Sequence, residues 1–135
     1  MGFTDKFRTQ HNEILAVAKE MTEAMKADAD AAVLRKLLSH LAGKLNFHLA
    51  LEDKALYPRL MDRRDTQTRA LAAQFISEMG GLGSVFGAYN TKWQVSAIKV
   101  DPAGFSAETQ QVFTALAQRI ARENRELYPL ADREN

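Results

Sequence analysis

Hydrophobic residues recur in the first part of the chain at alternating steps of three and four, with polar residues between them. This spacing indicates one face of an amphipathic helix, and Thr4 is a suitable N-cap for it. The stripe consists of Phe7, His11, Ile14, Ala18, Met21 and Met25. A second stripe of the same kind consists of Leu34, Leu38, Leu41, Leu45, His48, Glu52 and Leu56. We expect the second helix to end at Pro58, because proline disrupts a helix interior.

Two more helices are predicted in the second half of the chain. The third follows Asp65, and its stripe consists of Leu71, Phe75, Met79, Leu82, Phe86, Tyr89 and Trp93. The segment VDPAGFS is predicted to be a loop, with Ser106 capping a fourth helix. The stripe of that helix consists of Val112, Leu116, Arg119, Glu123 and Leu127. Since strand patterns are absent, the fold is predicted to be all-α: an up-down-up-down four-helix bundle of two helical hairpins, a single domain over residues 1–135.

The two halves of the sequence resemble each other. Shifting the chain by 71 residues lays HLALEDKALYP (residues 48–58) on RIARENRELYP (residues 119–129) and Glu52 on Glu123. The halves therefore look like two copies of one helical hairpin. The histidine that opens the first copy, His48, corresponds to Arg119 in the second.

Composition and charge narrow the class of protein. The chain has no cysteine, which excludes disulfides and thiolate metal sites. Its 18 basic and 17 acidic residues are interspersed, so no basic stripe for nucleic acid is present. The sequence has neither a run of about 18 apolar residues that could span a membrane nor the apolar core of a signal peptide. We therefore expect a cytoplasmic protein that binds neither nucleic acid nor membrane.

Four ionisable residues occupy stripe positions that should face the bundle interior: His11, His48, Glu52 and Glu123. Buried charges are costly without a metal, an opposite charge or a shifted pKa. Imidazole and carboxylate groups from facing helices suit iron, manganese or zinc. Each histidine taken alone could equally be a hydrogen-bonded core residue, and the metal site is inferred from all four together. His40 lies off the stripe and is predicted to be on the surface.

Tyr57 and Tyr128 each precede a proline at a predicted helix end. Packing and helix termination are sufficient to explain both tyrosines. Neither is therefore predicted to belong to the metal site.

With these residues in place, the sequence resembles the hemerythrin-like, HHE cation-binding family over about residues 5 to 130. The segments HLALEDKALYP and RENRELYP carry the resemblance. It implies a bundle of two hairpins that holds a non-haem di-iron centre and serves oxygen binding, sensing, storage or regulation. It further implies that His11 and His48 are ligands and that Glu52 and Glu123 are bridging carboxylates.

The sequence departs from the family pattern at two positions. The third-helix ligand position falls on Leu82, and the fourth-helix histidine is replaced by Arg119. We therefore expect one transition metal per chain, with iron favoured over manganese or zinc. Arg119 would pair with Glu123 or Glu52 in place of a second cation; alternatively, it extends to solvent.

Three functions are compatible with such a site. The first is a metal-dependent sensor or regulatory domain with an open position for a small ligand such as oxygen or nitric oxide. The second is a metal-free domain in which the same residues form an ionic network and the protein acts through protein contacts. The third is an oxygen-activating enzyme, although no substrate pocket or catalytic base is evident. Reversible oxygen carriage is disfavoured, because the ligands of a second iron are missing.

The third helix has an uncharged face opposite its hydrophobic stripe. That face consists of Ala73, Ile76, Gly80, Gly83, Ser84, Gly87 and Thr91. Each helical glycine costs roughly 0.5 to 1 kcal/mol relative to alanine, so a compensating close approach is expected. We predict a homodimer through this helix. The alternatives are relaxed selection and a break in the helix at Gly80 and Gly81.

Overall fold

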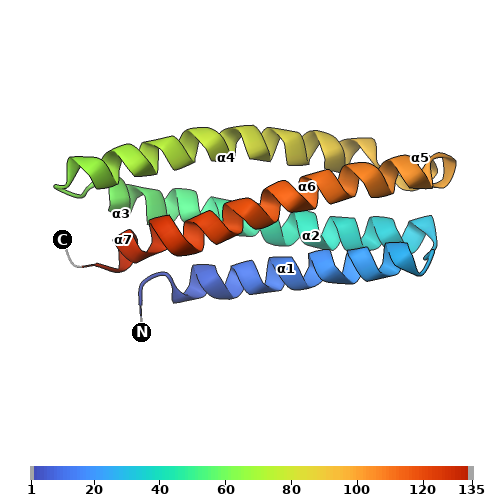
Figure 1. The fold of residues 1–135 in the computed structure, drawn as a ribbon, viewed down its shortest axis with the longest axis horizontal. Helices are drawn as coiled ribbons and strands as arrows, with labels where there is room; N and C mark the ends of the chain where they lie inside the picture. The colour runs from blue at the N-terminus through green and yellow to red at the C-terminus, as the bar shows by residue number, and fades with distance from the viewer. Residues whose placement is uncertain (1, 134–135) are drawn as a thin grey trace.

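The computed structural model describes residues 2–133 of the chain, and within these residues the only regular structure is helical. Four long helices lie side by side and alternate in direction (Figure 1). They are α1 (Asp5–Lys26), α2 (Ala31–Leu51), α4 (Thr66–Lys92) and α6 (Pro102–Arg122). The predicted all-α bundle of two hairpins is therefore confirmed. Residues 1, 134 and 135 of the predicted domain lie outside the described part.

We predicted that the second helix would end at Pro58, and this prediction is wrong. Neither the second nor the fourth helix ends at its proline. Each instead continues through one π-helical turn, η1 (Glu52–Leu56) or η2 (Glu123–Leu127), into a last short helix, α3 (Tyr57–Met61) or α7 (Tyr128–Asp132). In each π turn the tyrosine N–H bonds the glutamate carbonyl five residues earlier. Proline lacks an N–H and crowds the carbonyl four residues back in an α-helix. The wider π turn gives the proline ring the room that a regular α-helical turn would not.

The fourth helix begins at Pro102, so the predicted loop and the predicted cap at Ser106 are wrong. Asp101 is the N-cap, and its Oδ1 accepts a hydrogen bond from the Gly104 N–H at 2.9 Å. Proline suits the first helical position, where its missing N–H is not needed. A short helix that we did not predict, α5 (Val95–Val100), precedes this cap.

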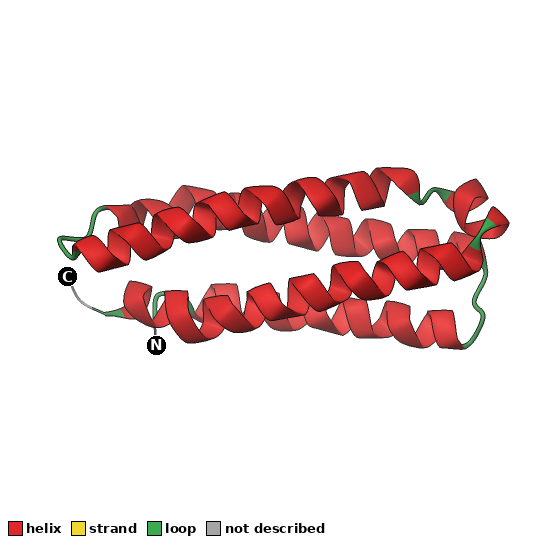
Figure 2. Cartoon of the chain, turned by 45° about the horizontal axis from the view of Figure 1, so that its top comes forward, coloured by secondary structure: helices red, strands yellow, loops and turns green. Residues whose placement is uncertain are grey.

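The first helix begins after Thr4, as predicted, but not through a capping hydrogen bond. The Thr4 hydroxyl instead donates to Asp132 Oδ2 at 2.7 Å, and the Thr4 N–H donates to Oδ1 of the same carboxylate at 2.9 Å. These bonds tie the beginning of α1 to the end of α7 at one end of the bundle, where Figure 1 shows both termini. Loops occur at the bundle ends and leave the helix flanks uninterrupted (Figure 2).

Two hydrophobic clusters fill the bundle along its length. The larger contains Ile14, Met21, Leu38, Leu41, Phe86, Tyr89, Phe105 and Leu116, among others. The smaller contains Phe7, Leu56, Tyr57, Leu60, Ala72, Phe75, Leu127, Tyr128 and Ala131. The four polar stripe residues are buried as predicted, whereas His40 is exposed. None of the helices in the described part is long and apolar enough to cross a bilayer.

Helix α4 is continuous through Gly80 and Gly81, which excludes a break there. On its uncharged face, Ile76 is 41% exposed, and a Cβ atom added at Gly80, Gly83 or Gly87 would meet no atom within 4 Å. The glycines therefore make no close backbone approach within one chain. The homodimer through this face stays a prediction.

Candidate metal centre

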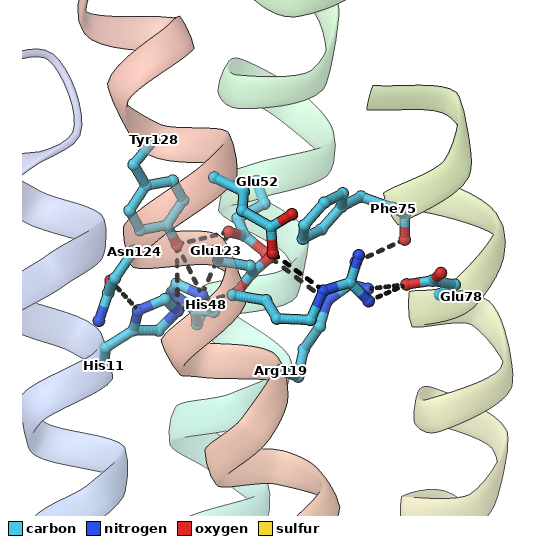
Figure 3. Close-up of polar contacts among 11 residues, drawn as sticks. His11, His48, Glu52, Phe75, Glu78, Arg119, Glu123, Asn124 and Tyr128 are labelled. Atoms are coloured by element: carbon cyan, nitrogen blue, oxygen red, sulfur yellow. Dashed lines mark hydrogen bonds and ion pairs between the residues drawn. The ribbon is translucent and has the colours of Figure 1, made fainter. Parts of the chain in front are cut away.

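Four side chains from both hairpins converge inside the bundle. His11 comes from α1, His48 from the last turn of α2, and Glu52 and Glu123 from the first positions of the two π turns. Each is at most 1% exposed. One ligand atom from each residue lies within 4.8 Å of the ligand atoms of the other three (Figure 3). The structure therefore brings together the four residues that the sequence singled out.

Both histidines present the same ring nitrogen to this cluster. His11 Nδ1 lies 2.9 Å from Asn124 Oδ1, and His48 Nδ1 lies 2.7 Å from Gln10 Oε1. An amide oxygen can only accept, so each Nδ1 carries its proton and donates. The Nε2 atoms of both rings are then directed at the carboxyl groups, an arrangement typical of metal-binding histidines.

The first of the two carboxyl groups, that of Glu123, faces His11, with its Oε1 3.0 Å from Nε2. Burial, together with the negative charge of Glu52, raises the pKa of the Glu123 carboxyl well above its usual value. Burial lowers the pKa of His11. The two directions agree: without a metal, the proton stays on Glu123, which donates it to the neutral His11.

The second carboxyl group, that of Glu52, behaves in the opposite way. Burial alone would raise its pKa, but the hydrogen bond and charge of His48 and the hydrogen bond from Tyr128 together lower it. The Tyr128 hydroxyl donates to Glu52 Oε2 at 2.6 Å. Glu52 is therefore the ionised member of the carboxyl pair.

One oxygen of each carboxyl group has no hydrogen-bond partner among the described residues. These atoms are Glu52 Oε1 and Glu123 Oε2, and both are buried. An unsatisfied buried acceptor costs about 1 to 3 kcal/mol. Two unpaired carboxyl oxygens beside two imidazole Nε2 atoms form a donor set that fits a transition metal such as iron, manganese or zinc.

Tyr128 also belongs to this cluster, contrary to our expectation that packing alone would explain it. Its hydroxyl lies 3.1 Å from His11 Nε2 and 3.5 Å from His48 Nε2, besides its bond to Glu52. An α-helical period of 3.6 places position 128 away from the face of Glu123. The π turn instead closes over five residues, so Tyr128 returns above Glu123. The Tyr-Pro pair that follows each glutamate is the sequence signal for this placement.

Arg119 lies at the edge of the cluster and is buried, with 6% exposure. Its Nη1 pairs with Glu78 Oε2 at 3.0 Å, its Nη2 donates to the Phe75 carbonyl, and its guanidinium stacks 4.2 Å from the centre of the Phe75 ring. Its Nε is 3.8 Å from Glu123 Oε2. The predicted pairing with Glu123 is thus present but long. Extension to solvent is wrong, and the main partner, Glu78 on α4, was not foreseen.

A cavity of about 330 Å³ reaches the cluster between α2 and α4. Its lining includes Glu52 and, from α4, Ile76, Met79, Gly80 and Gly83. Leu82 packs instead against the larger hydrophobic cluster. The position that the 71-residue shift assigned to the third-helix ligand therefore lies against this hydrophobic cluster and not in the lining of the cavity. The α4 residues of this lining include no histidine or carboxylate.

The arrangement of paired histidines and glutamates in a four-helix bundle agrees with a comparison with known families. Residues 2–131 match the model described as the hemerythrin HHE cation binding domain. The chain belongs to this hemerythrin family. The match covers both hairpins and all four residues of the buried cluster. No curated protein and no solved structure matched the chain.

Membership of this family supports metal binding by the buried cluster. Cation binding is the property after which the hemerythrin HHE domain is described, and His11, His48, Glu52 and Glu123 are the residues here that could hold a metal ion. Gln10, Asn124 and Tyr128, which contact these ligands, and Glu78, which holds Arg119, were missed from the sequence. Apart from the Tyr-Pro signal for Tyr128, these contacts are tertiary and no helical periodicity encodes them.

Proposed function

We propose that this hemerythrin-family protein binds one transition metal ion per chain, iron in preference to manganese or zinc, and serves as a sensor or regulatory domain in the cytoplasm. His11, His48, Glu52 and Glu123 would hold the ion. When bound, the ion would supply an open coordination position for a small ligand such as oxygen or nitric oxide.

A single observation carries the proposal. Two histidines have their Nδ1 protons fixed by amide oxygens, and their Nε2 atoms face two carboxyl groups that each have a buried, unpaired oxygen. A hydrogen-bonded core without a metal would leave fewer such acceptors unsatisfied. The contacts of Gln10 and Asn124 with the two histidines therefore support metal coordination by this cluster.

One ion rather than two is proposed because the pseudo-symmetric half of the site differs. The position equivalent to His48 is Arg119, and its guanidinium is held by Glu78 and Phe75 on α4. The fixed positive charge lies 3.8 Å from Glu123 Oε2 and would repel a second cation there.

A metal-free domain acting through protein contacts is the second candidate. It is supported by the closed network in which Glu123 bonds His11 and Tyr128 bonds Glu52. In that case the buried residues would serve only the stability of the bundle. The two unpaired carboxyl oxygens weigh against this function.

Nitric oxide is a suitable probe of the proposed sensor site. Protein loaded with ferrous iron under anaerobic conditions should give an iron–nitrosyl EPR signal on addition of nitric oxide, in proportion to the iron content. His48→Ala should abolish the signal, whereas His40→Ala, which changes an exposed histidine on the same helix, should preserve it. A protein that binds iron but gives no nitrosyl signal would contradict the sensor role.

A further inference from the structure

The Tyr128 hydroxyl lies in the middle of the candidate ligands rather than beside them. It is 2.6 Å from Glu52 Oε2, 3.1 Å from His11 Nε2 and 3.5 Å from His48 Nε2. An oxygen that reaches three ligand atoms at once lies within coordination range of an ion that those atoms share. Figure 3 shows this hydroxyl pointing into the cluster from α7.

We propose that Tyr128 is a fifth protein ligand of the metal, bound as phenolate. This inference rests on the proposed function, since it requires that the cluster hold an ion. On binding, the phenol O–H bond breaks, the oxygen shares its electron pair with the metal, and the proton leaves to the solvent.

The position of the tyrosine ring is fixed before any ion binds. The Tyr128 side chain is fully buried, and its ring stacks on that of His11 at 5.2 Å with an interplanar angle of 16°. The π turn sets its backbone one turn beyond Glu123. The hydroxyl therefore needs little movement to coordinate.

Charge identifies the oxidation state that such a site prefers. Two carboxylates and one phenolate carry three negative charges, one more than the four-ligand site without Tyr128. This added negative charge should favour ferric iron over ferrous iron relative to that four-ligand site.

Tyr57 provides a matched control. It occupies the same place in the first E-x-x-x-L-Y-P segment, is 5% exposed, and follows the equivalent π turn. Its hydroxyl makes no hydrogen bond to the four candidate ligands and is unpaired among the described residues. The two tyrosines thus differ in their contacts with the cluster and little else.

Visible absorption of the ferric protein tests the proposal, because ferric phenolate gives a charge-transfer band that histidine and carboxylate ligands do not. Protein loaded with ferric citrate should show this band, and resonance Raman excitation within it should enhance tyrosine ring modes. Tyr128→Phe should lose the band, and its iron content is measured in the same sample. Tyr57→Phe should keep the band. The zinc-loaded protein should show no band.

Each other outcome overturns the proposal. Iron bound without a band, or a band that survives Tyr128→Phe, would remove Tyr128 from the ligand set and leave the proposed metal function standing. Protein that binds no iron would overturn both. If Tyr128→Phe folds poorly, the Raman measurement on the unaltered protein still decides, since absence of enhanced tyrosine modes would exclude phenolate coordination.

Discussion

At the scale of single residues, the Glu123 carboxyl links the stability of the metal-free protein to pH. Its pKa is raised in the folded state, so between its unfolded value and its folded value the native protein binds more protons than the unfolded chain. The stabilising proton is fully present below the unfolded pKa and is lost as pH rises through the folded pKa. We predict that Glu123→Gln, which stays neutral, gains stability relative to the unaltered protein over this range.

Urea unfolding of the metal-free protein from pH 4.5 to pH 8 would test this pH dependence. The free-energy difference between Glu123→Gln and the unaltered protein should grow in favour of glutamine as pH rises. A difference that stays constant across the range would show that Glu123 has an ordinary pKa.

Arg119 is predicted to stabilise the fold through its contacts with α4. Arg119→Ala removes a buried guanidinium that bonds the Phe75 carbonyl and pairs with Glu78, and should cost about 3 kcal/mol. Glu78→Gln changes the half-exposed partner and retains an acceptor, so it should cost at most about 1 kcal/mol. Chemical denaturation would measure the free energy of unfolding of both variants. Equal losses in the two variants would contradict this prediction.

At the scale of elements, the four helices could be predicted from hydrophobic periodicity, and so could the two histidines and two glutamates on the stripes. The continuation beyond Pro58 could not, because the π turn replaces the 3.6-residue period on which the prediction rested. That one change of period also concealed Tyr128. Glu78 was equally hidden, since its role depends on an arginine 41 residues away.

The start of α6 depends on the side chain of Asp101. We predict that Asp101→Ala destabilises the protein by about 1 kcal/mol, because the Gly104 N–H loses its capping acceptor. Asp101→Asn keeps an oxygen in the same place and should cost much less. Thermal unfolding of the three proteins would measure the difference, and equal melting temperatures would show that the cap contributes nothing.

The uncharged face of α4 should mediate self-association. Gly87 on this face is exposed and has space around it, so Gly87→Glu should fold normally but yield monomers. Gly43→Glu makes the same change at an exposed glycine of α2 and should leave a dimer intact. Sedimentation at tens of micromolar would distinguish them. An unaltered protein that is monomeric at this concentration would exclude the dimer.

At the scale of the whole molecule, the two hairpins contribute unequally to one centre. The first supplies both histidines and Glu52, whereas the second supplies Glu123 and the Tyr128 hydroxyl. In the second hairpin the position equivalent to His48 is occupied by Arg119, which is bound to α4. The two hairpins therefore share their backbone arrangement, whereas the side chains that they contribute to the site differ.

The number of metal ions per chain is the most direct test of this account. Elemental analysis of protein purified without chelator should give about one transition metal ion per chain, most abundantly iron, and His48→Ala should reduce it toward zero because a ligand is lost. The exposed His40→Ala control should retain the metal. Two ions per chain would contradict the single-metal centre, and none, in a protein that folds normally, would contradict metal binding itself.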